Sequence, residues 1–132
     1  MKMMNKIISL SVILCFTLSC ISIPHYKELY VDSRTEIYQD HTLGYIWDII
    51  TRVLIENDYM ITSTDRIGGI ILAKKEYGHP GDRYLSGSNS LMILIQDGNH
   101  DVVVICTSRV YKISAHPREI LNEFFESLNG NI

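Results

Sequence analysis

The sequence predicts a single α+β domain, in which an antiparallel sheet of about four to five strands carries two helices on one face. Three observations support this fold class. The chain has 132 residues, which suits one domain. Two stretches repeat apolar residues at three- and four-residue steps, as amphipathic helices do. Several β-prone runs are separated by short turn-forming segments, which favours antiparallel neighbours.

The N-terminal segment, residues 1–19, has the features of a signal peptide. A short basic start precedes an apolar stretch from Ile7 to Leu18. That stretch has the length of a signal-peptide apolar region and is too short to span a bilayer. Ser19 then precedes Cys20, and polar residues begin soon afterwards. The segment resembles a bacterial lipoprotein signal, and the resemblance implies that cleavage leaves Cys20 as the lipid-carrying N-terminus.

The match to the lipoprotein signal has one departure. Thr17 and Leu18 stand as if exchanged relative to the usual order of a large apolar and a small residue. Three interpretations therefore remain open: a lipoprotein anchored at Cys20, a secreted protein without lipid, and an uncleaved membrane anchor. Several acyl chains hold a protein stably on a membrane, whereas one chain does not. Ile21 is not the aspartate that retains lipoproteins in the inner membrane, so the family rule implies the outer membrane of the bacterial envelope, on either its periplasmic or its surface side.

Residues 20–35 are expected to form the lipidated cysteine and a tether. They include Pro24, carry mixed charge and show no clear period. The domain is expected to cover residues 36–132, with a short first strand at 36–39.

A helix is expected to start after Asp40 or Thr42, either of which suits the cap position, and to end near Glu56. Trp47 is predicted to be a core anchor on its apolar face. The residues of that face are Leu43, Ile46, Trp47, Ile50, Val53 and Leu54.

Four further strands and one further helix complete the expected domain. The strands are expected at residues 59–63, 70–74, 90–95 and 101–107, the last with a possible extension to 113. Gly69 is expected to allow the turn of the first hairpin. The second helix is expected to begin at Pro117 and to end at Gly130. Its apolar side would consist of Ile120, Leu121, Phe124, Phe125 and Leu128.

Residues 76–89 form the longest irregular segment and are rich in Gly, Pro and Ser. Such a loop is either functional or a solvated connection. Four of its side chains are candidate partner contacts: Tyr77, His79, Arg83 and Tyr84.

The helix with Trp47, the segment 57–61, Asp65 and the run 69–73 together resemble the repeated domain of BamC, a lipoprotein of the outer-membrane β-barrel assembly machine. The resemblance covers roughly residues 36–73 and implies a helix-grip style, with a long helix lying on a curved antiparallel sheet. BamC has two such domains and a long N-terminal segment, whereas this chain would hold one domain. Membership in the assembly machine is therefore not implied.

The sequence contains no motif of catalysis or of cofactor binding. Its three cysteines do not form a disulfide framework, and Cys106 is expected to be a small buried apolar residue. The five histidines are scattered without metal-ligand spacing, and no nucleophile elbow is present. Residues 20–132 contain 10 Lys and Arg against 15 Asp and Glu, a net charge of −5, which gives no reason to bind nucleic acid. We therefore expect no enzyme activity, no cofactor and no metal.

Two functions remain. The first is a non-catalytic envelope lipoprotein that binds or supports a protein partner through a sheet edge or through the loop at 76–89. The second is a small-molecule carrier that uses space between helix and sheet. A carrier needs an apolar cavity of at least about 300 Å³. A domain filled by Trp47, Phe124 and Phe125 would exclude it.

Overall fold

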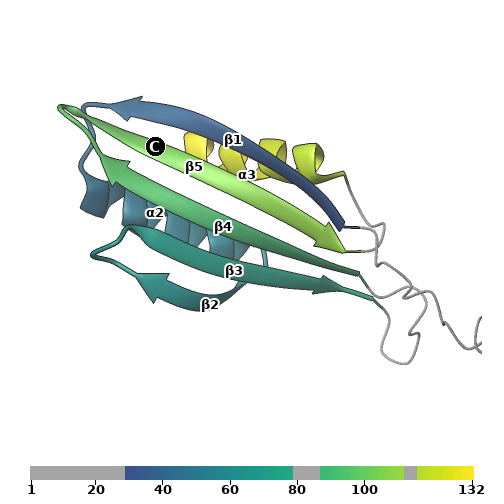
Figure 1. Cartoon of the computed structure of the whole chain (residues 1–132). Coiled ribbons are helices and arrows are strands. Elements are labelled where there is room, and N and C mark those ends of the chain that lie inside the picture. The colour runs from purple at the N-terminus through teal and green to yellow at the C-terminus, as the bar shows by residue number, and fades with distance from the viewer. Residues whose placement is uncertain (1–28, 79–86, 112–115) are drawn as a thin grey trace, which may run out of the picture.

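A computed structural model of the protein describes residues 29–78, 87–111 and 116–132. The described elements are β1 (Leu29–Gln39), α2 (Leu43–Glu56), β2 (Met60–Asp65), β3 (Ile70–Tyr77), β4 (Gly87–Asp97), β5 (Asp101–Tyr111) and α3 (Pro117–Asn131). The strands form one antiparallel sheet in the order β1-β5-β4-β3-β2. Figure 1 shows both helices against the same side of this sheet. The predicted α+β class with one-sided helices is therefore confirmed.

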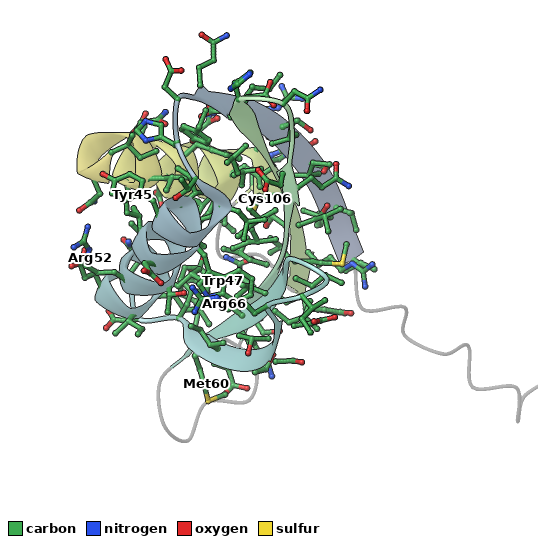
Figure 2. The ribbon with its side chains drawn as sticks, turned by 90° about the vertical axis from the view of Figure 1, so that its left-hand side faces the viewer. Tyr45, Trp47, Arg52, Met60, Arg66 and Cys106 are labelled. Atoms are coloured by element: carbon green, nitrogen blue, oxygen red, sulfur yellow. The ribbon has the colours of Figure 1, made fainter. Side chains whose placement is uncertain are left out.

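Helix α2 begins and ends close to its predicted limits. The Thr42 hydroxyl oxygen accepts a hydrogen bond from the backbone N–H of Tyr45 at 3.2 Å, so Thr42 rather than Asp40 is the N-cap. Asn57 caps the other end. Trp47 is 7% exposed, with the Arg66 guanidinium 5.8 Å from its ring centroid, which confirms its role as a core anchor (Figure 2).

Helix α3 begins at Pro117, as predicted, because proline suits the first helical position. The ring nitrogen Nδ1 of His116 accepts a hydrogen bond from the backbone N–H of Arg118 at 3.2 Å. The helix continues through Gly130 to Asn131, so the prediction that Gly130 ends it is wrong by one residue. Its predicted apolar side is buried, and the buried members are Ile120, Leu121, Phe124, Phe125 and Leu128.

The core lies between the helices and the inner face of the sheet. Alternate residues of each central strand point into it, as the two-residue period of a strand requires. Cys106 on β5 is fully buried among them, as expected. The strand residues of the core are Tyr38, Ile71, Ala73, Leu91, Ile93, Ile95, Val102, Val104, Cys106 and Val110.

Gly69 makes the hairpin between β2 and β3 possible. It has φ of 69°, a left-handed conformation that L side chains rarely adopt. A Cβ atom at this position would lie 2.1 Å from the backbone oxygen of Ile95. The backbone N–H of Ile95 also donates to the oxygen of Gly69 at 2.7 Å, so the backbones of the turn and of β4 are held in close contact. The expectation that Gly69 allows this turn is confirmed.

Two predicted boundaries are wrong. Strand β1 starts at Leu29, so residues 29–35 belong to the sheet and not to a tether. Only its last four residues were predicted as strand. The rest was missed because the strand lies at the sheet edge, where Tyr38 is its one buried side chain, so no apolar alternation marks it. Strand β1 is held in the sheet by backbone pairing with β5, from Leu29 opposite Tyr111 to Gln39 opposite Asp101. The irregular segment is also shorter than 76–89, because β3 extends to Tyr77 and β4 starts at Gly87.

Candidate functional site

The sheet face turned away from α2 and α3, here called the outer face, is the most unusual surface of the domain. None of the described elements covers it (Figures 1 and 2). Strand register arranges its side chains in five rows across β1, β5, β4 and β3. From one end to the other, the rows are Ile37–Val103–Gln96, Thr35–Ile105–Leu94–Ile70, Ser33–Thr107–Met92–Leu72, Val31–Arg109–Ser90–Lys74 and Leu29–Tyr111–Ser88–Glu76.

Seven neighbouring positions of the outer face are apolar. This apolar cluster consists of Ile37, Ile70, Leu72, Met92, Leu94, Val103 and Ile105. Ile37 is 59% exposed, Met92 42% and Leu72 36%, and the other four members are partly exposed. Single exposed apolar side chains are ordinary, but a contiguous exposed patch marks a surface that meets another molecule.

Polar side chains surround the apolar cluster. Lys74 Nζ lies 2.7 Å from Glu76 Oε1, and the hydrogen bond from this ammonium lowers the pKa of the Glu76 carboxyl. Arg109 carries a second positive charge and Asp65 on β2 a second negative one. An apolar centre with a polar rim is the usual plan of a protein–protein interface.

The two sheet edges are protected against pairing with another strand. On β1, the charged side chains of Asp32, Arg34 and Glu36 alternate on the side that faces α3, and charges placed inward on an edge strand oppose strand addition. On the other edge, β2 has six residues and a bulge between Ile61 and Ser63. The geometry thus favours the outer face over a sheet edge as the binding surface.

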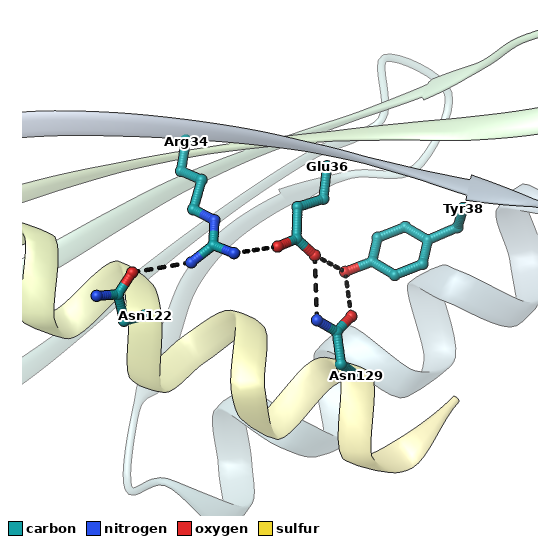
Figure 3. Close-up of polar contacts among 5 residues, drawn as sticks. All are labelled: Arg34, Glu36, Tyr38, Asn122 and Asn129. Atoms are coloured by element: carbon teal, nitrogen blue, oxygen red, sulfur yellow. Dashed lines mark hydrogen bonds and ion pairs between the residues drawn. The ribbon is translucent and has the colours of Figure 1, made fainter.

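A polar network joins β1 to α3 (Figure 3). Arg34 Nη1 donates to Asn122 Oδ1 at 2.8 Å, while its Nη2 pairs with Glu36. The Tyr38 hydroxyl lies 2.8 Å from Glu36 Oε2 and 2.9 Å from Asn129 Oδ1. Burial, followed by the hydrogen bond and charge of Glu36, raises the pKa of Tyr38. Through these hydrogen bonds and the ion pair, the network fastens the edge strand to the helix.

A second polar chain is buried beneath the helices. Asn89 and Ser108 are both 0% exposed. Asn89 Nδ2 donates to the Tyr59 hydroxyl oxygen at 2.6 Å, and Ser108 Oγ donates to Asn89 Oδ1 at 3.2 Å. Burial raises the pKa of Tyr59, and neighbouring Tyr77 adds to the effect. The sequence does not reveal this polar chain, because Asn89 lies in a segment expected to be an irregular loop.

The cleft beside Tyr59 is small. Its volume is about 30 Å³, and it is lined by Val53, Leu54, Asn57, Tyr59, Lys75, Tyr77, Ile120, Glu123 and Phe124. Lys75 Nζ donates to the backbone oxygen of Asn57 at 2.9 Å and lies 5.6 Å from the ring centroid of Tyr59. The ammonium thus holds the end of α2 against β3. The space is far below the roughly 300 Å³ of a ligand cavity.

Chemically reactive groups are sparse within the described ranges. In residues 29–78, 87–111 and 116–132, no three His, Cys, Asp or Glu side chains come together as a metal site. Burial raises the pKa of the Cys106 thiol, which is the opposite of what a nucleophilic cysteine requires. No helix in this part of the chain is long and apolar enough to cross a membrane.

The structure places one of the candidate partner contacts. Tyr77 ends β3 on the side of the helices, where its ring centroid is 5.4 Å from Lys75 Nζ, and it is therefore not part of the outer face. His79, Arg83 and Tyr84 lie outside the described residues, as does the candidate lipid-attachment residue Cys20.

The domain is thus an open-faced α+β sandwich whose uncovered sheet face is the candidate binding surface. No protein-family description matches the chain, and no curated protein matches it. One similar solved structure is that of a DUF4468 family protein from Bacteroides ovatus ATCC 8483, with a TM-score of 0.41 and 17% sequence identity. The match covers 64% of this chain and 57% of that chain, so this chain spans little more than half of its neighbour.

Proposed function

We propose that the protein is a non-catalytic lipoprotein of the bacterial envelope, anchored through Cys20, whose domain binds another protein on its outer face. The observation that carries the binding function is the apolar cluster, which lies uncovered on one side of a sheet whose other side packs against α2 and α3. The anchor rests on the sequence, in which Cys20 follows a short apolar stretch and Ser19.

The chemistry of the outer face favours one kind of partner. Flat sheet faces pack on other flat apolar surfaces at about 10 Å, with side chains interdigitating between them. The rim, with Lys74, Glu76 and Arg109, suits a partner with charges of both signs. We therefore propose a folded protein with a flat apolar surface, rather than an extended peptide, nucleic acid or small molecule.

A small-molecule carrier is less well supported. Trp47, Phe124 and Phe125 are 7%, 5% and 0% exposed, so they fill the layer between helices and sheet. The cleft of about 30 Å³ beside them has room for a water molecule and not for a ligand. A wider hollow of about 310 Å³ lies between β1 and α3, but five of its six lining residues are charged or polar, so it is not the apolar cavity of a carrier. Its lining residues are Asp32, Ser33, Arg34, Arg118, Leu121 and Asn122.

Metabolic labelling with a palmitate analogue tests the anchor. The wild-type chain should carry the label and fractionate with membranes, whereas Cys20→Ala should be unlabelled. Cys15→Ser, which changes another cysteine of the N-terminal segment, is the matched control and should remain labelled. Membrane association without label in the wild type would instead favour an uncleaved anchor, and unlabelled release from cells would favour simple secretion.

Photo-crosslinking in intact cells tests the binding surface. A photoreactive amino acid at Met92, in the apolar cluster, should give a discrete protein adduct. The same amino acid at Arg52, an exposed residue on α2, is the control and should give none. Absence of any adduct at Met92, or equal adducts at both positions, would falsify binding through the outer face.

A further inference from the structure

We infer that the occupant of the outer face is a second copy of the same chain, so that two domains pair sheet against sheet. This inference rests on the proposed function, because it names the partner of the surface proposed there. Three features support it: the charge of the face, its area and the direction of its strands.

The outer face carries little net charge although the protein is acidic. Its charged side chains are two basic and three acidic ones, in the rows defined above, on β2 and in the adjoining pair Gln39–Asp101: Lys74, Arg109, Asp65, Glu76 and Asp101. Residues 20–132 carry a net charge of −5, so most of this charge lies outside the outer face. Two identical acidic proteins repel each other least when they approach through the face with the lowest net charge, and opposite charges on the rim can pair across the interface.

The area of the outer face is adequate for a dimer. Neighbouring strands lie about 4.8 Å apart and successive outward residues about 6.8 Å apart, so each position covers roughly 33 Å². The five rows contain nineteen positions, or roughly 630 Å² per copy. Two copies would bury roughly 1,260 Å², which is at the lower end of the range for specific interfaces. The apolar cluster would form the dry centre of that area.

The strand direction makes such a dimer compatible with two anchors in one membrane. Strand β1 begins at Leu29, and the anchor proposed at Cys20 precedes it by nine positions. Sheets in a sandwich pack with their strands nearly aligned. A two-fold axis parallel to the strands therefore places Leu29 of both copies at the same end, where both chains can reach one bilayer. Confinement to that bilayer also raises the effective concentration of each copy for the other.

The fit of the apolar cluster to itself follows from the same axis. If the axis runs between β4 and β5, the β4 strand of one copy faces the β5 strand of the other. Met92 then lies opposite Thr107 of the second copy, with Leu94 and Ile105 paired in the next row. Leu94 of each copy thus meets Ile105 of the other at the centre of the face, and this mutual pairing is what an isologous interface requires.

Cysteine crosslinking of the full chain in intact cells tests this inference. With a short bis-maleimide, Met92→Cys should give a band at the mass of two chains, while Arg52→Cys should remain monomeric. Cys106 is fully buried and should not react in either variant. A specific adduct of Met92→Cys with a different protein would overturn the dimer and leave the proposed binding function intact. No dimer band from Met92→Cys would overturn the inference, and photo-crosslinking at Met92 then shows whether another protein occupies the face. Equal dimer bands from both variants would indicate random collision and would also overturn the inference.

Sedimentation of the mature chain in detergent gives an independent check. The wild type should sediment as a dimer, and Met92→Lys should shift it to a monomer by raising the dimer dissociation constant about 100-fold, because a charge is then buried without a partner. Met92 is 42% exposed in the single domain, so the variant should keep the circular dichroism of the fold. A wild-type monomer at every concentration, or a dimer that Met92→Lys leaves unchanged, contradicts the inference.

Discussion

Replacing Asn89 with alanine probes the buried polar chain between β4 and the helices. The Asn89 side chain is fully buried and makes two hydrogen bonds, to Tyr59 at 2.6 Å and from Ser108 at 3.2 Å. Each bond contributes about 1 kcal/mol, and the buried Ser108 hydroxyl would lose its acceptor. Loss of the amide group also leaves a cavity in a packed core. We expect Asn89→Ala to lower the free energy of unfolding by about 3 kcal/mol in total.

Urea unfolding followed by fluorescence measures this effect directly. Trp47 is the one tryptophan of the chain and is 7% exposed, so its emission reports on loss of the core. Ser108→Ala is the matched control, because it removes one of the two hydrogen bonds and should cost about 1 kcal/mol. Both variants should be compared with the wild type at one protein concentration, since a dimer adds concentration-dependent stability. A cost below about 1 kcal/mol for Asn89→Ala, or an equal cost for both variants, would refute the assignment of Asn89 as the centre of the chain.

Three further predictions follow from the fold. Gly69→Ala should lower stability by roughly 2–4 kcal/mol, because the new Cβ meets the Ile95 carbonyl in a left-handed turn; an unchanged urea midpoint would contradict this. Phe125→Ala should cost about 3–5 kcal/mol in the same assay, since Phe125 is fully buried, and a cost under about 1 kcal/mol would mean the core collapses around it. The raised pKa of Tyr38 means that its hydroxyl holds the proton more tightly in the folded state than in the unfolded chain. The resulting contribution to the free energy of unfolding is complete below about pH 10 and is lost as the pH rises further. Tyr38→Phe should therefore reduce the alkaline loss of stability by up to about 1.4 kcal/mol per pH unit, measured by urea unfolding from pH 9 to 11, and parallel curves for the two proteins would argue against it.

Most of the architecture could be predicted because apolar periodicity is strong in the elements that form the core. The helix with Trp47 shows a three- and four-residue repeat. Five of its six predicted face residues are buried, Leu43 is only partly buried, and Ile49 is buried in addition. Strands β4 and β5 are apolar on both faces, so their existence was clear. The prediction of both helices on one face leaves the other face open, but the exposed apolar cluster on it was not predicted, because an unbroken apolar run is expected of a strand covered on both sides.

The missed features depend on pairing and three-dimensional contact. The first part of strand β1 places charged and hydroxyl residues in succession at Asp32, Ser33, Arg34 and Thr35, without the apolar alternation of a half-buried strand. Its partner β5 is more than 60 positions away, a distance over which no sequence period extends. The polar chain through Asn89 likewise joins residues from three strands or their borders. Such contacts leave no repeat in the sequence, and only the fold brings them together.

The pairing of β1 with β5 also has a consequence for the order of folding. The strand is made first but finds its partner only after β5 exists, with Leu29 and Tyr111 separated by 82 positions. Until then, β5 is the edge of a four-stranded sheet, and its run Val102–Val103–Val104–Ile105 offers unpaired backbone to other chains. Contacts so distant in sequence close slowly and leave such intermediates prone to aggregate. Strand β1 is therefore the last strand to join the sheet, and its pairing replaces the aggregation-prone edge at β5 with an edge that carries charged side chains.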